Sequence, residues 1–197
     1  MKYAPQPAAI FARLLAEKNG DTISTAANTK FADIPAHAWY SGYVKYLSNN
    51  GITYGKSKTI FAPNDAITRA EFTTMAVRFF DVYGDGDAEI MEQFSGFNDV
   101  SSGYWAAEYI KYAALHGWIN GYGDGSFHAD REINRAEVVT IVNRLLGREA
   151  DEDYIADNLR KLNTFPDVTK RHWAYYAVME AANAHTAVLG ESESWSK

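Results

Sequence analysis

The sequence contains no cysteine, no long apolar run and no block of basic residues. The lack of cysteine excludes a disulfide-stabilised scaffold, a cysteine-ligated zinc or iron–sulfur site, and a thiol nucleophile. No stretch approaches the roughly 18 consecutive apolar residues that a transmembrane helix requires, so no membrane span is expected. Because nucleic-acid binding depends on neutralising phosphates, a net charge of −6 without a basic segment argues against a nucleic-acid partner.

The first residues also lack the features of a signal peptide, because no charged region is followed by an apolar stretch. Either the protein stays in the cytoplasm or the chain is a piece of an exported protein, and composition does not choose between the two. The 197 residues have an apolar fraction of 47%, which is enough to bury a core in one large or two small domains.

An internal repeat runs through the chain. When residues 31–80 are placed over residues 97–146, at an offset of 66, 15 of the 50 positions are identical without a gap. The identical pairs include Asp33/Asp99, Trp39/Trp105, Gly55/Gly121, Arg69/Arg135 and Arg78/Arg144. Partial copies stand at both ends, since residues 165–174 repeat the front half and residues 9–15 repeat the end of the back half. The chain therefore reads back half, whole copy, whole copy, front half.

Each whole copy is expected to form two helices joined by a turn-rich loop. In the front half, apolar residues such as Trp39, Tyr43 and Leu47 recur at the spacing of one helix face. The back helix follows Thr68 or Asn134, each with a glutamate three residues later, which is the pattern of a capping box. The expected back helices cover about residues 7–18, 69–80 and 135–147. The expected front helices cover about residues 39–49, 105–116 and 173–185. Polar linkers on the surface are expected at residues 19–30, 81–96 and 148–164.

These three helix pairs predict an all-α fold, a pseudo-threefold bundle of three helix pairs with irregular loops. We expect a single domain over residues 1–197, with a partial repeat at 1–18, whole repeats at 31–80 and 97–147, and a partial repeat at 165–197.

Several spaced motifs recur in phase in the two whole copies. The second copy reads Phe97-Asn98-Asp99-Val100, then Trp105-Ala106, Gly117, the loop Gly121-Tyr122-Gly123-Asp124-Gly125-Ser126-Phe127, and Ile133-Asn134-Arg135-Ala136-Glu137. The first copy reads Phe31-Ala32-Asp33-Ile34, then Trp39, Gly51, Phe61 and Ile67-Thr68-Arg69-Ala70-Glu71. This pattern resembles the S-layer homology (SLH) family, and the resemblance covers nearly the whole chain outside the linkers.

The resemblance implies a non-catalytic module at the bacterial cell surface that binds secondary cell-wall polysaccharide, commonly a pyruvylated and therefore anionic glycan. Such modules hold S-layer proteins and other exported proteins on the cell wall, with the ligand in grooves between neighbouring repeats. Carried over by position, the family's ligand residues are Arg69 and Arg135, Asp33, Asp99 and Asp167, Trp39, Trp105 and Trp173, and Gly55 and Gly121. No cofactor or metal is expected. The chain is expected to be an extracellular fragment without its signal peptide, with a cargo domain upstream.

The chemistry of these residue types agrees with such a ligand. Arg69 and Arg135 stand at the first helical position, where free N–H groups and the helix dipole favour an anion. A guanidinium can also bind the carboxylate of a pyruvyl ketal with two hydrogen bonds. Tryptophan rings suit the C–H faces of sugars, and glycines let the backbone approach a ligand closely.

Each of these residues also has a structural interpretation. The tryptophans could pack on apolar helix faces, and the aspartates could hydrogen-bond the loops. Glu71 and Glu137 are better explained as capping-box partners than as ligands. Arg78 and Arg144 lie nine residues after the motif arginines, about half a turn around the helix, and are assigned to another face with a structural role.

Other site chemistries find little support. The five histidines show no pair at a spacing of four, and the acidic stretch 85–89 lacks the glycine and the final glutamate of a calcium loop. No carboxylate pair stands out for glycoside hydrolysis, so the protein is not expected to be an enzyme. A protein–protein interaction domain, whose aromatic grooves bind a protein or peptide, remains the alternative function.

The terminal copies depart from the motif. Residues 3–6 replace the Thr/Asn-Arg-Ala-Glu segment in the first copy, so its arginine is missing, and the last copy ends without a glycine-rich loop. We therefore predict that the terminal copies complete the helix pairs, while at most two grooves keep a full set of ligand residues.

Overall fold

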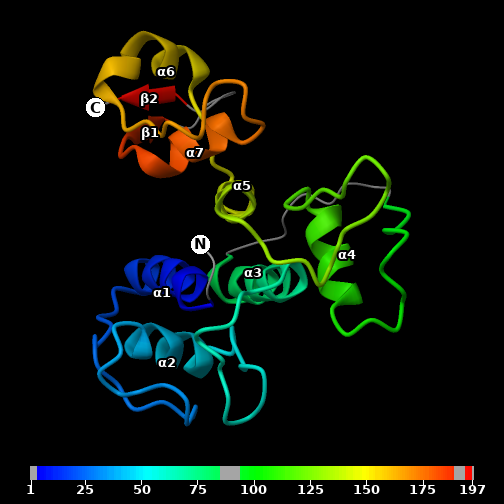
Figure 1. Cartoon of the computed structure of the whole chain (residues 1–197). Helices are drawn as coiled ribbons and strands as arrows, with labels where there is room; N and C mark the ends of the chain where they lie inside the picture. The colour runs from blue at the N-terminus through cyan, green and yellow to red at the C-terminus, as the bar shows by residue number, and fades with distance from the viewer. Residues whose placement is uncertain (1–3, 85–93, 189–193, 197) are drawn as a thin grey trace. The chain divides into compact units, whose positions relative to one another are not determined.

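The computed structural model describes residues 4–84, 94–188 and 194–196, and these residues are mainly helical (Figure 1). The helices are α1 (Pro5–Asn19), α2 (Ser41–Asn49), α3 (Arg69–Tyr83), α4 (Ala107–Leu115), α5 (Arg135–Leu145), α6 (Glu152–Asn158) and α7 (Tyr175–Ala182), with one 3₁₀ turn, η1 (Leu159–Lys161). Two short antiparallel strands, β1 (Thr186–Val188) and β2 (Ser194–Ser196), pair near the C-terminus. The predicted all-α class is confirmed.

The chain divides into two compact units, which run from Met1 to Asn134 and from Arg135 to Lys197. Unit 1 contains the contacting pairs α1/α2 and α3/α4, and unit 2 contains the pair α5/α7. Each pair consists of a back helix and the front helix that follows it, as the repeat predicts. The threefold arrangement of the three pairs, and their union in one domain, stay predictions.

The core of unit 1 is built around phenylalanines from two back helices. The ring of Phe11 in α1 stacks on Phe72 of α3 with centroids 5.5 Å apart, and lies 4.7 Å from Phe79. All three side chains are fully buried. Phe72 and Phe79 are two helical turns apart and share one face of α3, and burial of each ring contributes about 2–3 kcal/mol. The partial first repeat is thus part of the core that it shares with the first whole repeat.

The starts of the back helices follow the local sequence. Thr68 caps α3, because its hydroxyl accepts a hydrogen bond from the N–H of Glu71 while the Glu71 carboxylate accepts one from the N–H of Thr68 at 3.0 Å. The predicted capping box is confirmed there. Helix α1 instead starts with Pro5, whose missing N–H costs nothing at this position, and ends at Gly20 with a φ of 69°. The first back helix therefore forms without the motif's cap.

The front helices begin two residues later than predicted. Trp39, Trp105 and Trp173 precede the first residues of α2, α4 and α7, which are Ser41, Ala107 and Tyr175. The tryptophans thus stand in the turn before each helix rather than on its buried face, which leaves their rings free to face solvent.

Unit 2 contains structure that the sequence analysis missed. Segment 148–164, expected to be a polar surface linker, contains α6, whose Ile155 is buried with Tyr175, Met179 and Trp195 in a core of its own. The carboxylate of Asp151 caps α6 through the N–H of Tyr154 and also accepts a hydrogen bond from the N–H of Trp195 at 3.0 Å. The prediction of a surface linker is therefore wrong for this segment. A helix of seven residues with one buried apolar side chain is too short to show the apolar periodicity of a helix in its sequence.

The structure bears on the expected absence of a membrane span and of a metal site only for the residues that it describes. Within residues 4–84, 94–188 and 194–196, no helix has the length and apolarity to cross a membrane, and no group of three or more potential ligands could hold a metal ion. The acidic stretch 85–89 lies outside the described residues.

Candidate functional site

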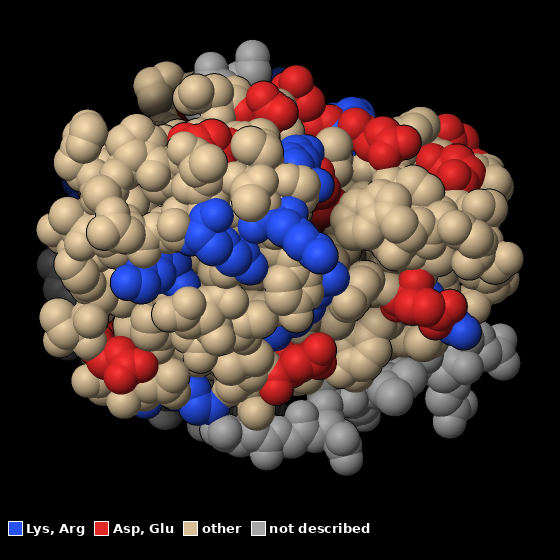
Figure 2. Space-filling view, turned by 90° about the horizontal axis from the view of Figure 1, so that it is seen from below, with Lys and Arg blue, Asp and Glu red and all other residues tan. Residues whose placement is uncertain are grey.

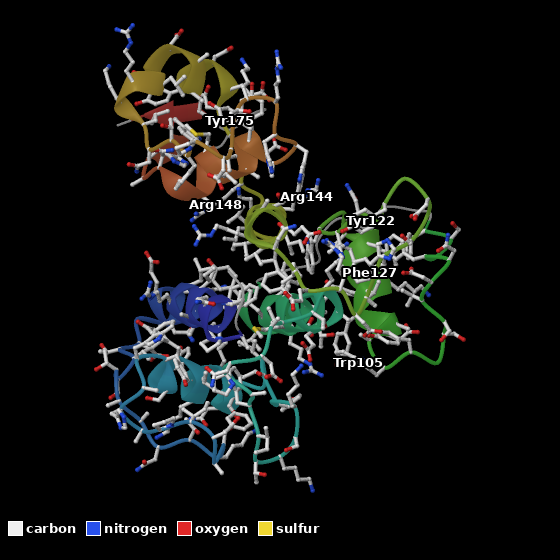
Figure 3. The ribbon with its side chains drawn as sticks, viewed as in Figure 1. Trp105, Tyr122, Phe127, Arg144, Arg148 and Tyr175 are labelled. Carbon is white, nitrogen blue, oxygen red and sulfur yellow. The ribbon has the colours of Figure 1, made fainter. Side chains whose placement is uncertain are left out.

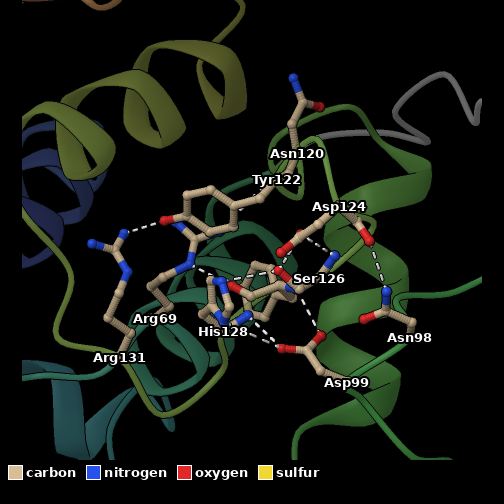
Figure 4. Close-up of polar contacts among 10 residues, drawn as sticks. Arg69, Asn98, Asp99, Asn120, Tyr122, Asp124, Ser126, His128 and Arg131 are labelled. Atoms are coloured by element: carbon tan, nitrogen blue, oxygen red, sulfur yellow. Dashed lines mark hydrogen bonds and ion pairs between the residues drawn. The ribbon is translucent and has the colours of Figure 1, made fainter.

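The glycine-rich loop of the second copy is held by Asp99. Its carboxylate accepts hydrogen bonds from the backbone N–H groups of Phe127 and His128, both at 2.7 Å (Figure 4). His128 has a φ of 54°, a conformation that L-residues seldom adopt, so the aspartate stabilises a strained turn. Burial alone would raise the pKa of Asp99, but these hydrogen bonds outweigh it and hold the pKa below its usual value.

The first copy repeats this arrangement, and the last does not. Asp33 accepts hydrogen bonds from the N–H groups of Phe61 at 2.9 Å and Ala62 at 2.7 Å, and Ala62 has a φ of 61°. Asp167, at the same motif position, is exposed, and no hydrogen bond of its side chain is found among the described residues. The hydrogen-bonded interpretation of the motif aspartate is therefore confirmed for two of its three copies.

The motif glycines make room for the motif phenylalanines. A Cβ atom on Gly55 would lie 2.5 Å from the ring of Phe31, and one on Gly121 would lie 2.4 Å from the ring of Phe97. In both loops a backbone carbonyl oxygen also lies within 2.6 Å of the added atom. Gly55 has a φ of 73° in addition. Both glycines thus have a packing reason for their place in the motif.

Replacement of Gly121 by alanine is expected to lower the free energy of unfolding by about 1–3 kcal/mol, because the added methyl group overlaps a ring and a backbone carbonyl that cannot both move away. Urea denaturation followed by circular dichroism measures this loss. Gly123→Ala is the control, since nothing lies within 4 Å of its added Cβ. Equal midpoints for the two variants would contradict the packing argument.

Arg69 lies inside unit 1, with only 5% of its surface exposed. Its Nε donates to the carbonyl oxygen of Phe127 at 2.8 Å and its Nη2 to that of Asn120 at 3.3 Å. The guanidinium carbon lies 4.4 Å from the ring centroid of Phe127 and 5.1 Å from that of Tyr122 (Figure 4). The first-copy arginine therefore holds the loop of the second copy.

Arg135, at the same motif position, has a different environment. It is the first residue of α5 in unit 2, and its side chain is exposed. The two arginines that sequence analysis treated as equivalent thus differ in exposure, and Arg135 is the one that an external anion could reach.

The motif tryptophans are exposed, with 53%, 56% and 64% of the surface of Trp39, Trp105 and Trp173 accessible. The alternative that they pack in the core is therefore wrong. Trp105, whose side chain is labelled in Figure 3, lies at a cavity of about 280 Å³ in unit 1, together with the motif residue Gly55. The other residues that line this groove are Ala4, Ile52, Thr53, Tyr54, Lys56, Phe61, Ile67, Glu71, Thr74, Met75 and Arg78.

The groove carries two cations and one anion. Lys56 forms an ion pair with Glu71, the residue that also closes the capping box. The guanidinium of Arg78 donates from Nε and Nη2 to the hydroxyl of Tyr109 at 3.3 and 3.1 Å, and lies 4.6 Å from the ring centroid of Tyr54. An exposed indole beside fixed cations is suited to a sugar ring that carries an acidic group.

A second cavity, of about 330 Å³, lies in unit 2. Trp173 and Arg144 line it, in the positions that Trp105 and Arg78 hold in the repeat, together with Thr140, Asn143, Arg148, Glu149, Ala150, Glu152, Ala174, Tyr176 and Ala177. In each unit, a motif tryptophan and a back-helix arginine therefore line the same cavity.

Charge is distributed unevenly over the surface. Figure 2 shows lysine and arginine side chains gathered near the middle of the face that it draws, with aspartate and glutamate side chains around them. The net charge of −6 therefore does not describe every part of the surface.

Comparison with known proteins identifies the repeats. The family model described as the S-layer homology domain matches residues 30–73 and 96–139. The chain belongs to the S-layer homology family. The two matched segments contain the motif residues from Asp33 to Arg69 and from Asp99 to Arg135, so they coincide with the two whole copies found from the sequence.

Curated relatives of this SLH chain include cell-surface proteins from two bacteria. Cell surface glycoprotein 1 of Acetivibrio thermocellus is 30% identical over 196 residues, which cover 95% of this chain and 8% of the relative. The cellulosome-anchoring protein of the same organism is 29% identical over 189 residues, or 95% of this chain and 40% of the relative. The surface-layer 125 kDa protein of Lysinibacillus sphaericus is 30% identical over 131 residues, which cover 65% of this chain and 11% of the relative.

These relatives and the SLH match support a cell-surface anchoring module as the general role of the chain. The chain spans less than half the length of each of these relatives.

The SLH match ends before the arginines that line the cavities. The spacing of Arg78 and Arg144 predicts a structural role on another face, whereas in the structure both arginines line a cavity beside a motif tryptophan. The repeat contains a signal for this location, because Thr74 and Arg78, one helical turn apart on the same face, recur as Thr140 and Arg144.

Proposed function

We propose that this chain is a non-catalytic SLH module that binds secondary cell-wall polysaccharide, an anionic and pyruvylated glycan, and so holds a protein on the bacterial cell wall. The observation that carries the proposal is the groove of unit 1, where the exposed indole of Trp105 lies at one cavity with Arg78 and Lys56. The indole offers a flat apolar face to a sugar ring, and the cations offer charge-assisted hydrogen bonds to a carboxylate.

The predicted ligand residues enter this proposal in two groups. The exposed tryptophans and Arg135 are proposed to contact the glycan directly. The others are proposed to keep the two motif loops in shape, through the hydrogen bonds and close packing described above; they are Asp33, Asp99, Gly55, Gly121 and the buried Arg69. Asp167 is proposed as a further polar contact to the glycan, since its side chain is exposed.

An extracellular location on the cell wall and a cargo domain in the same polypeptide are part of the proposal. Both are consistent with the names of the relatives, of which the chain spans only 8% and 40% in the first two cases. A membrane span and a nucleic-acid partner have no part in it.

Purified chain is expected to sediment with bacterial sacculi, and acid removal of the wall polymer is expected to abolish this binding. Trp105→Ala should weaken binding about tenfold, because it removes roughly 1–2 kcal/mol of apolar contact. The measurement is the fraction bound over a series of sacculus concentrations, with Leu159→Ala as control, since Leu159 is exposed but lines none of the described cavities.

Binding that survives removal of the polymer, or that is equal in Trp105→Ala and Leu159→Ala, would contradict the proposal. In the first case a protein component of the wall, or peptidoglycan itself, would be the partner.

A further inference from the structure

The indole of Trp105 is exposed, yet its ring nitrogen is engaged. Trp105 has 56% of its surface accessible and lines the groove of unit 1. Its N–H donates a hydrogen bond to the side chain of the preceding residue, Tyr104, whose ring centroid lies 5.8 Å from that of the indole. An indole has a single polar atom, which can only donate. Because Tyr104 engages this atom, the ring offers its carbon surface to a ligand.

Tyr104 continues this hydrogen bonding to Asp130. Its hydroxyl donates to a carboxylate oxygen of Asp130 at 2.6 Å. Burial, and after it the hydrogen bond to Asp130, raises the pKa of Tyr104 to about 12, so the hydroxyl keeps its proton at neutral pH and remains a donor. Hydrogen bonds to a carboxylate are about twice as strong as those between neutral groups. Trp105, Tyr104 and Asp130 thus form a chain of two hydrogen bonds.

The backbone on both sides of Asp130 is fixed to the start of α3. The N–H of Arg69 donates to the carbonyl oxygen of Arg131 at 2.9 Å, and the N–H of Ala70 donates to that of Ala129, also at 2.9 Å. Residues of α3 line the same groove as Trp105. The side chain of Asp130 is exposed, but its position along the chain is therefore set relative to the groove. Through Asp130, the indole is tied to the helix that it faces across the groove.

The residue that precedes the motif tryptophan differs in the other two copies. Ala38 precedes Trp39, and its methyl group cannot form a hydrogen bond. His172 precedes Trp173, and its Nδ1 accepts a hydrogen bond from the N–H of Ala174 at 3.1 Å, while its ring centroid lies 5.8 Å from that of the indole. Neither residue can reproduce the link from a tyrosine hydroxyl to a carboxylate. Exposure is similar for the three tryptophans, so the restraint distinguishes the second copy.

We propose that Tyr104 and Asp130 are positioning residues of the unit 1 groove, which hold the indole of Trp105 in place for a sugar ring of the bound glycan. This proposal rests on the proposed function and adds two residues to it that the repeated motif does not include. An indole that is restrained before the ligand arrives loses less side-chain freedom on binding. Tyr104 and Asp130 therefore act through Trp105 and need no contact with the glycan.

Tyr104→Phe in the whole chain removes only the hydroxyl and keeps the ring. Without any ligand, the NMR order parameter of the Trp105 indole N–H, assigned with Trp105→Phe, is expected to fall. Binding to sacculi is expected to weaken about threefold to tenfold, because the freed side chain must be immobilised when the glycan binds. Tyr46→Phe is the matched control, since Tyr46 donates to the carboxylate of Asp21 at 2.5 Å and lines neither cavity. It should leave both measurements unchanged.

Variants of Asp130 test whether the two residues act as one unit. Asp130→Ala should reproduce most of the effect of Tyr104→Phe on the indole and on binding. Asp130→Asn keeps an oxygen that accepts a hydrogen bond, so it should recover most of the binding that Asp130→Ala loses. The double variant Tyr104→Phe/Asp130→Ala should bind about as well as the weaker single variant, because both substitutions remove the same hydrogen bond.

An order parameter of the Trp105 indole that is unchanged in Tyr104→Phe would overturn the proposal. Equal binding of Tyr104→Phe and Tyr46→Phe to sacculi, at a concentration where Trp105→Ala binds weakly, would overturn it as well, and so would additive losses in the double variant. In these cases the unmodified chain still binds the wall polymer, and the proposed function stands. Failure of the unmodified chain to bind sacculi would instead contradict the proposed function, and the positioning role with it. The two failures are therefore distinguishable.

Discussion

Replacement of Arg69 by alanine is expected to lower the free energy of unfolding by about 3–5 kcal/mol. The guanidinium is nearly fully buried and donates to the carbonyl oxygens of Phe127 and Asn120. Loss of these hydrogen bonds deprives two backbone carbonyl groups of a donor, and each loss lowers the free energy of unfolding by about 1–3 kcal/mol. Loss of the side chain between the rings of Tyr122 and Phe127 adds a packing term.

Urea denaturation of Arg69→Ala and Arg135→Ala measures this effect with a matched control at the same motif position. Arg135 is exposed, so its replacement should change stability by no more than about 0.5 kcal/mol. Arg69→Met keeps the apolar stem and should recover part of the loss, which separates the packing term from the hydrogen bonds. Equal effects of Arg69→Ala and Arg135→Ala would refute the assignment of Arg69 to the loop.

The same variants decide the role of the motif arginine in ligand binding. Folded Arg69→Met is expected to bind sacculi as the unmodified chain does, because its guanidinium is buried against the loop. Arg135→Ala is expected to weaken binding several-fold, since this exposed arginine stands at the first position of a helix. A larger loss of binding in Arg69→Met than in Arg135→Ala would reverse these assignments.

Replacement of Asp99 by alanine is expected to destabilise unit 1 by about 2–4 kcal/mol. The carboxylate satisfies the N–H groups of Phe127 and His128, and each lost partner costs about 1–2 kcal/mol. His128 would also have to keep its positive φ without support. Asp167→Ala is the matched control. Because this aspartate of the third copy is exposed, its replacement should lower the free energy of unfolding by less than about 0.5 kcal/mol.

Asp99 should also contribute to the loss of stability in acid. Its pKa is lower in the folded chain than in the unfolded one, so the stabilisation is present above the unfolded value of about 4. It is lost as the pH falls through the folded pKa. Denaturation midpoints measured from neutral pH to about pH 2 should fall less steeply for Asp99→Asn than for the unmodified chain. Parallel curves for the two proteins would contradict the assignment.

Much of the fold could be predicted because it depends on periodic patterns. The capping box of Thr68 and Glu71 and the apolar face that carries Phe72 and Phe79 are local, and the duplication displays each of them twice. Helix α6 could not be predicted, since its stability depends on Tyr175, Met179 and Trp195 from other segments. Local patterns carry no information about such contacts.

The candidate site was predictable only in part for the same reason. The motif identified Trp39, Trp105 and Trp173, which the structure exposes, and Asp33 and Asp99, which it hydrogen-bonds to the loops. Motif membership did not distinguish a residue that builds a loop from one that lines a cavity. Arg69 and Arg135 share a motif position, yet one is buried and the other is exposed.

The family, the all-α class and the order of the helices could all be inferred from the duplicated motif, because its helical periodicity and its recurrence report local structure and ancestry. Tertiary structure alone decided which arginines are accessible and which partners hold them. Tyr109 restrains Arg78 from a different helix, whereas Arg135 is exposed at the start of α5. Such contacts depend on distances between segments some 30 residues apart, so the charge that a ligand meets is a property of the folded chain.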